Sequence, residues 1–145
     1  MTRLKQAAHE AGLPYGERKM TYNSRLAQEL AKWAESKGKG DAFHQAVFRA
    51  YFVHGTNIGK VHELTELVNS IGLPGDEARE VLLKRVFKDA VDSDWARSHQ
   101  LGIQAVPTFV LDHNALVGAQ PYEKLVEFVE AFKVTKRKIE AYSPK

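Results

Sequence analysis

Apolar residues recur at intervals of three and four along the first hundred residues of the chain. Positions with this spacing share one face of a helix, so the pattern predicts a series of amphipathic helices. The expected helices cover about residues 2–11, 24–36, 41–52, 60–71, 76–88 and 89–101. We expect Asp41 and Asp76 to cap the third and fifth helices, because a carboxylate at this position accepts a hydrogen bond from a free backbone N–H.

The third of these helices holds the densest group of aromatic residues in the chain. Its apolar residues are predicted to crowd one wide face in the core: Phe43, Val47, Phe48, Tyr51 and Phe52. A second interpretation places Phe48, Tyr51 and Phe52 along a hydrophobic groove. In the helix at 89–101, Val91, Trp95 and Leu101 are expected to point inward.

The pattern changes after residue 102. Thr108–Leu111 and residues 115–117 are short apolar runs, and Asp112, His113 and Asn114 between them are turn formers, which together predict a β-hairpin. The turn lacks glycine, but Asn and His accept left-handed backbone angles more readily than most residues. Gln120 and Pro121 then open a final helix, whose apolar face is Leu125, Phe128, Val129 and Phe132.

The order of these elements is unusual for a complete domain. The 145 residues are enough for one domain with a core, and no repeat or long linker divides them. Two strands alone make a poor sheet, however, so helices followed by one hairpin do not complete an α/β architecture. We therefore predict a single partial domain: helices over residues 1–101, a proline loop with hairpin and helix over 102–133, and a basic tail over 134–145.

Composition limits the chemistry that the chain can perform. There is no cysteine, which excludes disulfides, thiolate metal sites and thiol catalysis by these residues. The net charge of +3 is too small to indicate nucleic-acid or membrane binding. The first residues lack the apolar core of a signal peptide, and no run has the length of a membrane span, so we expect a cytoplasmic protein.

Other candidate sites have simpler interpretations. No histidine pair has the His-x-x-x-His spacing of a zinc helix, so no metal is expected, and no pattern indicates a cofactor. Four acidic residues could form paired carboxylates, but they lie on helices rich in Lys and Arg and are expected on solvated helix faces. These residues are Glu77, Glu80, Asp92 and Asp94.

Several stretches resemble a known family. Gly-Ile-Gln-Ala-Val-Pro-Thr-Phe-Val at 102–110 and Val-Gly-Ala-Gln-Pro-Tyr-Glu at 117–123 resemble the C-terminal half of the DsbA-like thioredoxin superfamily, in its FrnE-like branch of dithiol-disulfide oxidoreductases. Asn-Ser-Arg-Leu-Ala at 23–27 and Phe-Arg-Ala-Tyr-Phe at 48–52 resemble the helical insertion of that branch. The resemblance implies a truncated α/β thioredoxin-like fold, with a mostly helical insertion before the hairpin and C-terminal helix.

The resemblance also implies a role for the proline loop. In this family the corresponding proline is cis and presents backbone groups to a peptide or thiol substrate, which would make Val106, Pro107 and Thr108 the substrate-contacting residues here. The family's Cys-x-x-Cys segment has no counterpart in the sequence, so no catalytic residue can be assigned. Kappa-class glutathione transferases and 2-hydroxychromene-2-carboxylate isomerases share the fold and the proline, but their catalytic serine also lies in that segment.

Three hypotheses about function follow. The chain is a partial oxidoreductase that is inactive alone, a peptide- or protein-binding module that has lost the chemistry, or a subunit whose catalytic part lies on another chain. In the complete fold the strand at Thr108–Leu111 would pair with a strand that this sequence lacks. An open strand edge favours pairing with another chain, so we predict a homo-oligomer, most simply a dimer, formed through that edge.

Overall fold

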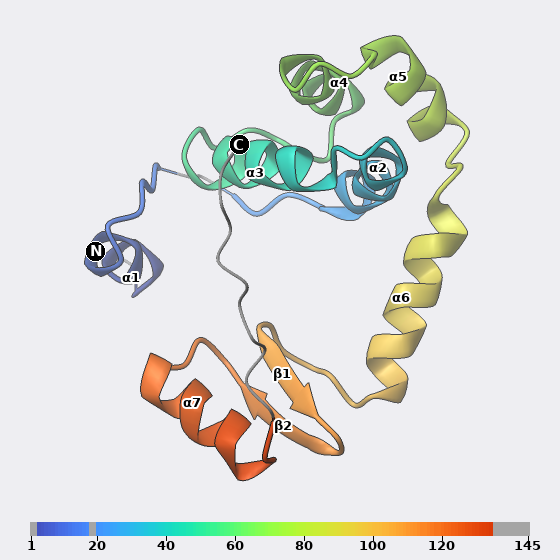
Figure 1. Cartoon of the computed structure of the whole chain (residues 1–145). Coiled ribbons are helices and arrows are strands. Elements are labelled where there is room, and N and C mark those ends of the chain that lie inside the picture. The colour runs from blue at the N-terminus through green and yellow to red at the C-terminus, as the bar shows by residue number, and fades with distance from the viewer. Residues whose placement is uncertain (1–2, 18–19, 135–145) are drawn as a thin grey trace, which may run out of the picture. The chain divides into compact units, whose positions relative to one another are not determined.

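The computed structural model describes residues 3–17 and 20–134 (Figure 1). All but the first residue of the predicted basic tail lies outside the described residues. The chain consists of two compact units: the helical unit, residues 1–95, and the hairpin unit, residues 96–145. The sequence predicts a single partial domain, with a boundary between its helical part and its proline loop at residue 101. That domain organisation stays a prediction.

The described residues form helices followed by a hairpin and a last helix, as predicted. The helices of the first part are α1 (Arg3–Glu10), α2 (Arg25–Ser36), α3 (Gly40–Phe52), α4 (Val61–Ser70), α5 (Gly75–Leu83) and α6 (Lys88–Gln100). After them come β1 (Thr108–Leu111), β2 (Asn114–Val117) and α7 (Tyr122–Ala131). The mostly helical region, the hairpin and the C-terminal helix are therefore confirmed.

The core of the helical unit surrounds α2, which packs against α3, α4 and α5. Leu30, Phe43, Leu64, Val68 and Leu82 come from these four helices and are almost completely buried. Small residues on the same helices, such as alanines of α2, let the helix axes approach one another. The core is thus built from residues spread over more than fifty positions of sequence.

The hairpin unit is organised differently. β1 and β2 are antiparallel, with Thr108 opposite Val117 and Leu111 opposite Asn114. In the described part of the chain the sheet has these two strands, so β1 has one paired edge. None of the described residues of this unit is classed as buried.

Some sequence predictions about individual residues were wrong. Phe48 is 58% exposed, because five residues along a helix turn it about 140° away from the buried Phe43. Trp95 and Leu101 are also exposed rather than inward, whereas Val91 of α6 is buried as predicted.

The predicted helix caps and turn also differ from the structure. α3 follows Lys39 and α5 follows Pro74, and neither of these N-cap residues makes a side-chain cap hydrogen bond. Asp41 and Asp76 lie within the first turns of the two helices. There they still favour the helix, because a negative charge near its N-terminus is stabilising. In the hairpin turn it is Asp112, not His113 or Asn114, that has left-handed angles, with φ of 52°.

Candidate functional site

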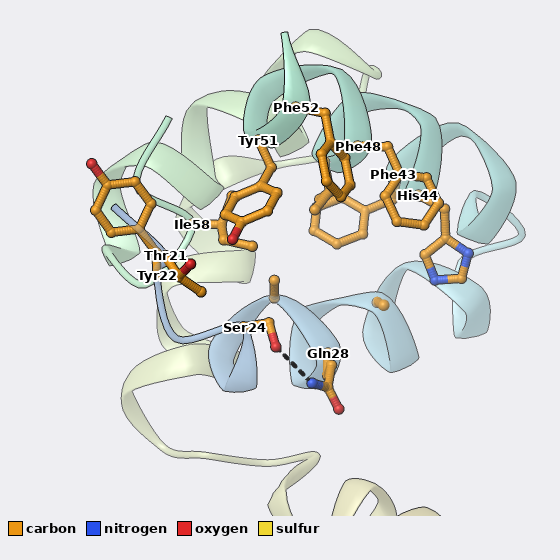
Figure 2. Close-up of a pocket in the computed structure, with 13 residues that line it drawn as sticks. Thr21, Tyr22, Ser24, Gln28, Phe43, His44, Phe48, Tyr51, Phe52 and Ile58 are labelled. Atoms are coloured by element: carbon orange, nitrogen blue, oxygen red, sulfur yellow. Dashed lines mark hydrogen bonds between the residues drawn. The ribbon is translucent and has the colours of Figure 1, made fainter. Parts of the chain in front are cut away.

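A pocket of about 440 Å³ lies between α2 and α3 in the helical unit (Figure 2). We call it the aromatic pocket. Its described lining residues are Thr21, Tyr22, Ser24, Ala27, Gln28, Ala31, Phe43, His44, Val47, Phe48, Tyr51, Phe52 and Ile58. The predicted groove residues Phe48, Tyr51 and Phe52 are all among them, so the structure places them around one cavity.

Aromatic residues of α3 form one wall of this pocket. Phe48 and Phe52 are one helical turn apart, and their ring centroids are 6.2 Å apart. The Tyr51 ring meets Phe52 edge-on at 4.9 Å, and His44 lies 6.4 Å from Phe48. Figure 2 shows these rings extending from α3 toward α2. The rings therefore contact one another along α3, and the pocket between α3 and α2 stays open.

The opposite wall belongs to α2 and has small and polar side chains. Ala27 and Ala31 are one turn apart and leave the space between the helices open. The Ser24 hydroxyl oxygen accepts a hydrogen bond of 2.9 Å from the Gln28 amide nitrogen. The Gln28 amide oxygen in turn accepts a hydrogen bond of 2.8 Å from the indole N–H of Trp95. Gln28 is therefore held between the pocket and α6.

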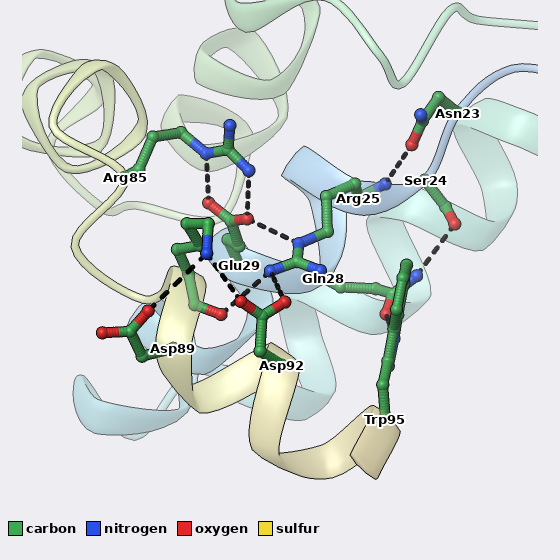
Figure 3. Close-up of polar contacts among 10 residues, drawn as sticks. Asn23, Ser24, Arg25, Gln28, Glu29, Arg85, Asp89, Asp92 and Trp95 are labelled. Atoms are coloured by element: carbon green, nitrogen blue, oxygen red, sulfur yellow. Dashed lines mark hydrogen bonds and ion pairs between the residues drawn. The ribbon is translucent and has the colours of Figure 1, made fainter. Parts of the chain in front are cut away.

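A network of charged side chains connects the other side of α2 with α6 (Figure 3). Arg85 donates two hydrogen bonds, of 2.7 and 2.6 Å, to the two carboxylate oxygens of Glu29. Arg25 donates to Glu29 at 2.7 Å and to Asp92 at 2.5 Å, and its guanidinium lies 4.8 Å from the centre of the Trp95 ring. These contacts join α2, the residues after α5 and the first turns of α6.

Glu29 is the most unusual member of this network, because its side chain is only 1% exposed. Hydrogen bonds from Arg85 lower its pKa, and they outweigh the burial that would raise it. The pKa of Asp92 is lowered by hydrogen bonds from Lys88 and Arg25. Both carboxylates are thus held ionised, which suits a structural ion-pair network and does not suit a general acid.

The sequence predictions for acidic residues had mixed outcomes. Glu80 pairs with Lys84 at 2.8 Å across one exposed helical turn, as predicted. Asp92 makes the expected pair with Lys88 but also binds Arg25 of another helix, which the helix-face interpretation missed. Glu29 was not singled out at all. Its position four residues after Arg25, on the apolar face of α2, was the available signal.

The predicted substrate loop lies in the hairpin unit. The Val106–Pro107 peptide bond is cis, as the family resemblance implies. Val106 is 89% exposed, whereas the Pro107 carbonyl oxygen accepts a hydrogen bond of 2.8 Å from the N–H of Gly118. The Thr108 hydroxyl donates to the carbonyl oxygen of Ala105 at 2.7 Å. Hydrogen bonds on both sides of the proline therefore fix the loop to the hairpin, while the Val106 side chain stays exposed.

Among the described residues, no three His, Asp or Glu side chains form a group that could hold a metal ion. No helix in the described part of the chain is long and apolar enough to cross a membrane.

Comparison with known proteins places this chain among relatives that are longer than it is. It is 32% identical over 95 residues to the uncharacterized protein YwbO of Bacillus subtilis, a match that covers 65% of this chain and 48% of YwbO. A crystal structure of a probable DsbA oxidoreductase from Streptomyces coelicolor superimposes with a TM-score of 0.79 and 29% identity. That match covers 95% of this chain and 62% of the other, so this chain spans about half to two thirds of these relatives.

A more distant structure shows the fold alone. The 2-hydroxychromene-2-carboxylate isomerase superimposes with a TM-score of 0.71 at 18% identity, covering 90% of this chain and 62% of the isomerase. The match to the family described as DSBA-like thioredoxin domain covers residues 1–130, which includes the helices, the proline loop, the hairpin and most of α7. The chain therefore belongs to the DSBA-like thioredoxin domain family.

Proposed function

We propose that this chain provides the substrate-contacting part of a DsbA-family thiol-disulfide oxidoreductase, of the FrnE-like branch, and has no redox activity by itself. The observation that carries the proposal is the proline loop at Val106, Pro107 and Thr108, which is hydrogen-bonded to the hairpin and exposes Val106, in a chain that belongs to this family. Exchange requires a thiolate that attacks a disulfide, and these 145 residues have no sulfhydryl group. The thiols must therefore come from the substrate and from polypeptide outside these residues.

The loop has a suitable chemistry for contacting an extended peptide. The exposed Val106 offers an apolar side chain that a bound peptide can contact. The hydrogen bonds of Pro107 and Thr108 hold the loop in one conformation, which lowers the entropy lost when a peptide binds.

The test combines an activity assay with a binding assay. The chain alone should reduce insulin disulfides no faster than buffer does. In an NMR titration with a short peptide that contains cysteine, the amide signals of Val106 and Thr108 should move in a saturable way. Pro107→Ala should abolish these shifts, whereas Pro14→Ala, in a loop of the helical unit, should leave them unchanged. Shifts confined to other residues, or insulin reduction by the chain alone, would contradict the proposal.

The intact mass of the protein from its native cells identifies the source of the thiols. A mass of 16.3 kDa means that they are on another chain. A larger mass that includes a Cys-x-x-Cys segment means that they are on the same chain. Cell fractionation in the same experiment tests the proposed cytoplasmic location.

A second candidate function is a non-catalytic binding module that forms oligomers. One edge of β1 pairs with β2. The other edge of β1 has no strand partner in the described part of the chain. Phe109 and Val110 on this strand are more than one-third exposed. We propose that this edge pairs with β1 of a second copy, because a short apolar edge strand favours such pairing.

Analytical ultracentrifugation tests this oligomer. The wild-type chain should sediment at twice its mass of 16.3 kDa. Val110→Lys should shift it toward the monomer, because a charged side chain on an edge strand opposes pairing. Val129→Lys, a similar change on α7, is the matched control and should not. A wild-type monomer at high concentration excludes this candidate.

A further inference from the structure

We propose that the aromatic pocket binds a small planar aromatic molecule that carries an uncharged hydrogen-bonding group, such as a phenol. This site lies in the helical unit and involves no thiol chemistry, so it goes beyond the proposed function of the proline loop.

The shape of the pocket favours a flat ligand. Its volume of about 440 Å³ is in the range of sites for small organic molecules. One wall consists of the rings of Phe48, Tyr51 and Phe52, and the facing wall has the small side chains of Ala27 and Ala31 (Figure 2). A planar ring between these walls can make edge or offset contacts with several aromatic rings at once. A saturated ring of the same size is thicker and lacks these favourable ring contacts.

The polar groups of the pocket favour an uncharged ligand. Ser24, which precedes α2, and Gln28 on α2 offer a hydroxyl and an amide, which can bond a ligand hydroxyl as donor or acceptor. The described residues that line the pocket include one imidazole, that of His44, and no Asp, Glu, Lys or Arg. A carboxylate that enters an apolar site without a cationic partner loses its hydration without compensation. A phenol keeps its hydrogen bond and avoids this cost.

The indole of Trp95 can report on binding in the pocket. The Ser24 hydroxyl, the Gln28 amide and the Trp95 indole form one continuous series of hydrogen bonds. A ligand hydroxyl that bonds Ser24 or Gln28 must change the environment of the Trp95 indole N–H. The indole of Trp33 donates to Glu77 instead and is not among the lining residues. The two indole signals of the protein should therefore respond differently.

The experiment uses the full chain, labelled with ¹⁵N, at pH 8, titrated with 4-methylphenol. The Trp95 indole signal, assigned with Trp95→Phe, should move in a saturable way while the Trp33 signal stays in place. By calorimetry, 4-methylbenzoate should bind about tenfold more weakly because it is charged. 4-Methylcyclohexanol should bind about fivefold more weakly because it is not planar.

Phe48→Ala should weaken 4-methylphenol binding about fivefold, since it removes a ring from the pocket wall. Tyr122→Ala is the matched control, because Tyr122 is another exposed aromatic residue, 76% exposed and in the hairpin unit, and it should leave binding unchanged. If Phe48→Ala does not retain the wild-type circular dichroism spectrum, Phe48→Leu replaces it and carries the same prediction.

Three results would overturn the proposal. The first is the absence of a saturable Trp95 shift with 4-methylphenol. The second is equal or tighter binding of 4-methylbenzoate, which would show that the pocket accepts an anion. The third is tighter binding of a tyrosine-containing peptide than of 4-methylphenol, which would make the pocket a peptide site. A failed proline-loop titration leaves these readouts unaffected, so the two proposals fail separately.

Discussion

The helical unit and the hairpin unit bury their apolar side chains to very different extents. Every buried residue of the described chain precedes residue 92, and the apolar side chains of the core come from α2, α3, α4, α5 and α6 together with Ile58. The hairpin unit has apolar residues in a similar pattern, yet Val106, Val110, Val117 and Val129 are all at least 40% exposed. The difference shows that an apolar pattern produces a core only where enough elements surround it.

The number and length of elements explain this difference. In the helical unit α2 is covered by three other helices, so its apolar face is enclosed. In the hairpin unit, two strands of four residues and one helix of ten supply too little surface to enclose one another. The hairpin therefore depends mainly on backbone hydrogen bonds and on its turn, which contribute less than burial does.

The sharpest test compares the same substitution in the two units. Phe43→Ala should lower the free energy of unfolding by about 3 to 5 kcal/mol, because Phe43 is fully buried and its removal leaves a cavity. Phe109→Ala, at a residue that is 38% exposed, should cost about 1 kcal/mol or less. Urea unfolding followed by circular dichroism measures both. Equal costs for the two changes would contradict the comparison.

The ion-pair network provides a second, smaller effect within the helical unit. Glu29→Gln should lower the free energy of unfolding by about 2 to 3 kcal/mol, because it leaves Arg25 and Arg85 without their shared, buried carboxylate. Glu80→Gln is the control. Glu80 makes a solvent-exposed ion pair with Lys84, and the loss of this pair should change the free energy of unfolding little. A loss as large in Glu80→Gln would mean that burial of the network is unimportant.

The same network predicts a dependence of stability on pH. The pKa of Glu29 is lower in the folded chain than in the unfolded chain, chiefly because Arg85 hydrogen-bonds its ionised form. Its contribution is therefore complete above the unfolded pKa and is lost as the pH falls below about 5 toward the folded pKa. The difference in stability between wild type and Glu29→Gln should shrink over this range in urea titrations at several pH values. A constant difference would show that Glu29 does not titrate in this way.

The smallest expected effect is in the hairpin unit. Asp112→Val should destabilise the hairpin by about 1 kcal/mol, because a β-branched residue disfavours the left-handed φ of 52° at this position. His113→Val is the matched control, since the neighbouring turn residue does not have a left-handed φ. Amide hydrogen exchange of β1 and β2 measures the change, about fivefold in rate for 1 kcal/mol. If both variants accelerate amide exchange in the hairpin to a similar extent, backbone strain at residue 112 is not the cause of the destabilisation.

The sequence by itself determined which segments are helices, where the hairpin lies and which chemistry is excluded. Periodicity depends only on neighbours along the chain, so the helices and the hairpin could be predicted within a few residues. The segment containing Val106 and Pro107 was enough to identify the family, and the lack of cysteine was enough to exclude thiol chemistry by these residues.

Tertiary structure alone decided the surroundings of individual side chains. Periodicity defines an apolar face but not which neighbouring helix covers it, so the sequence left a core position and a groove position open for Phe48, and the structure places it on a pocket wall. Glu29 pairs with Arg85, 56 positions away, and Gln28 with Trp95, 67 positions away. Such partners are brought together by helix packing, and no local pattern in the sequence encodes distances of that kind.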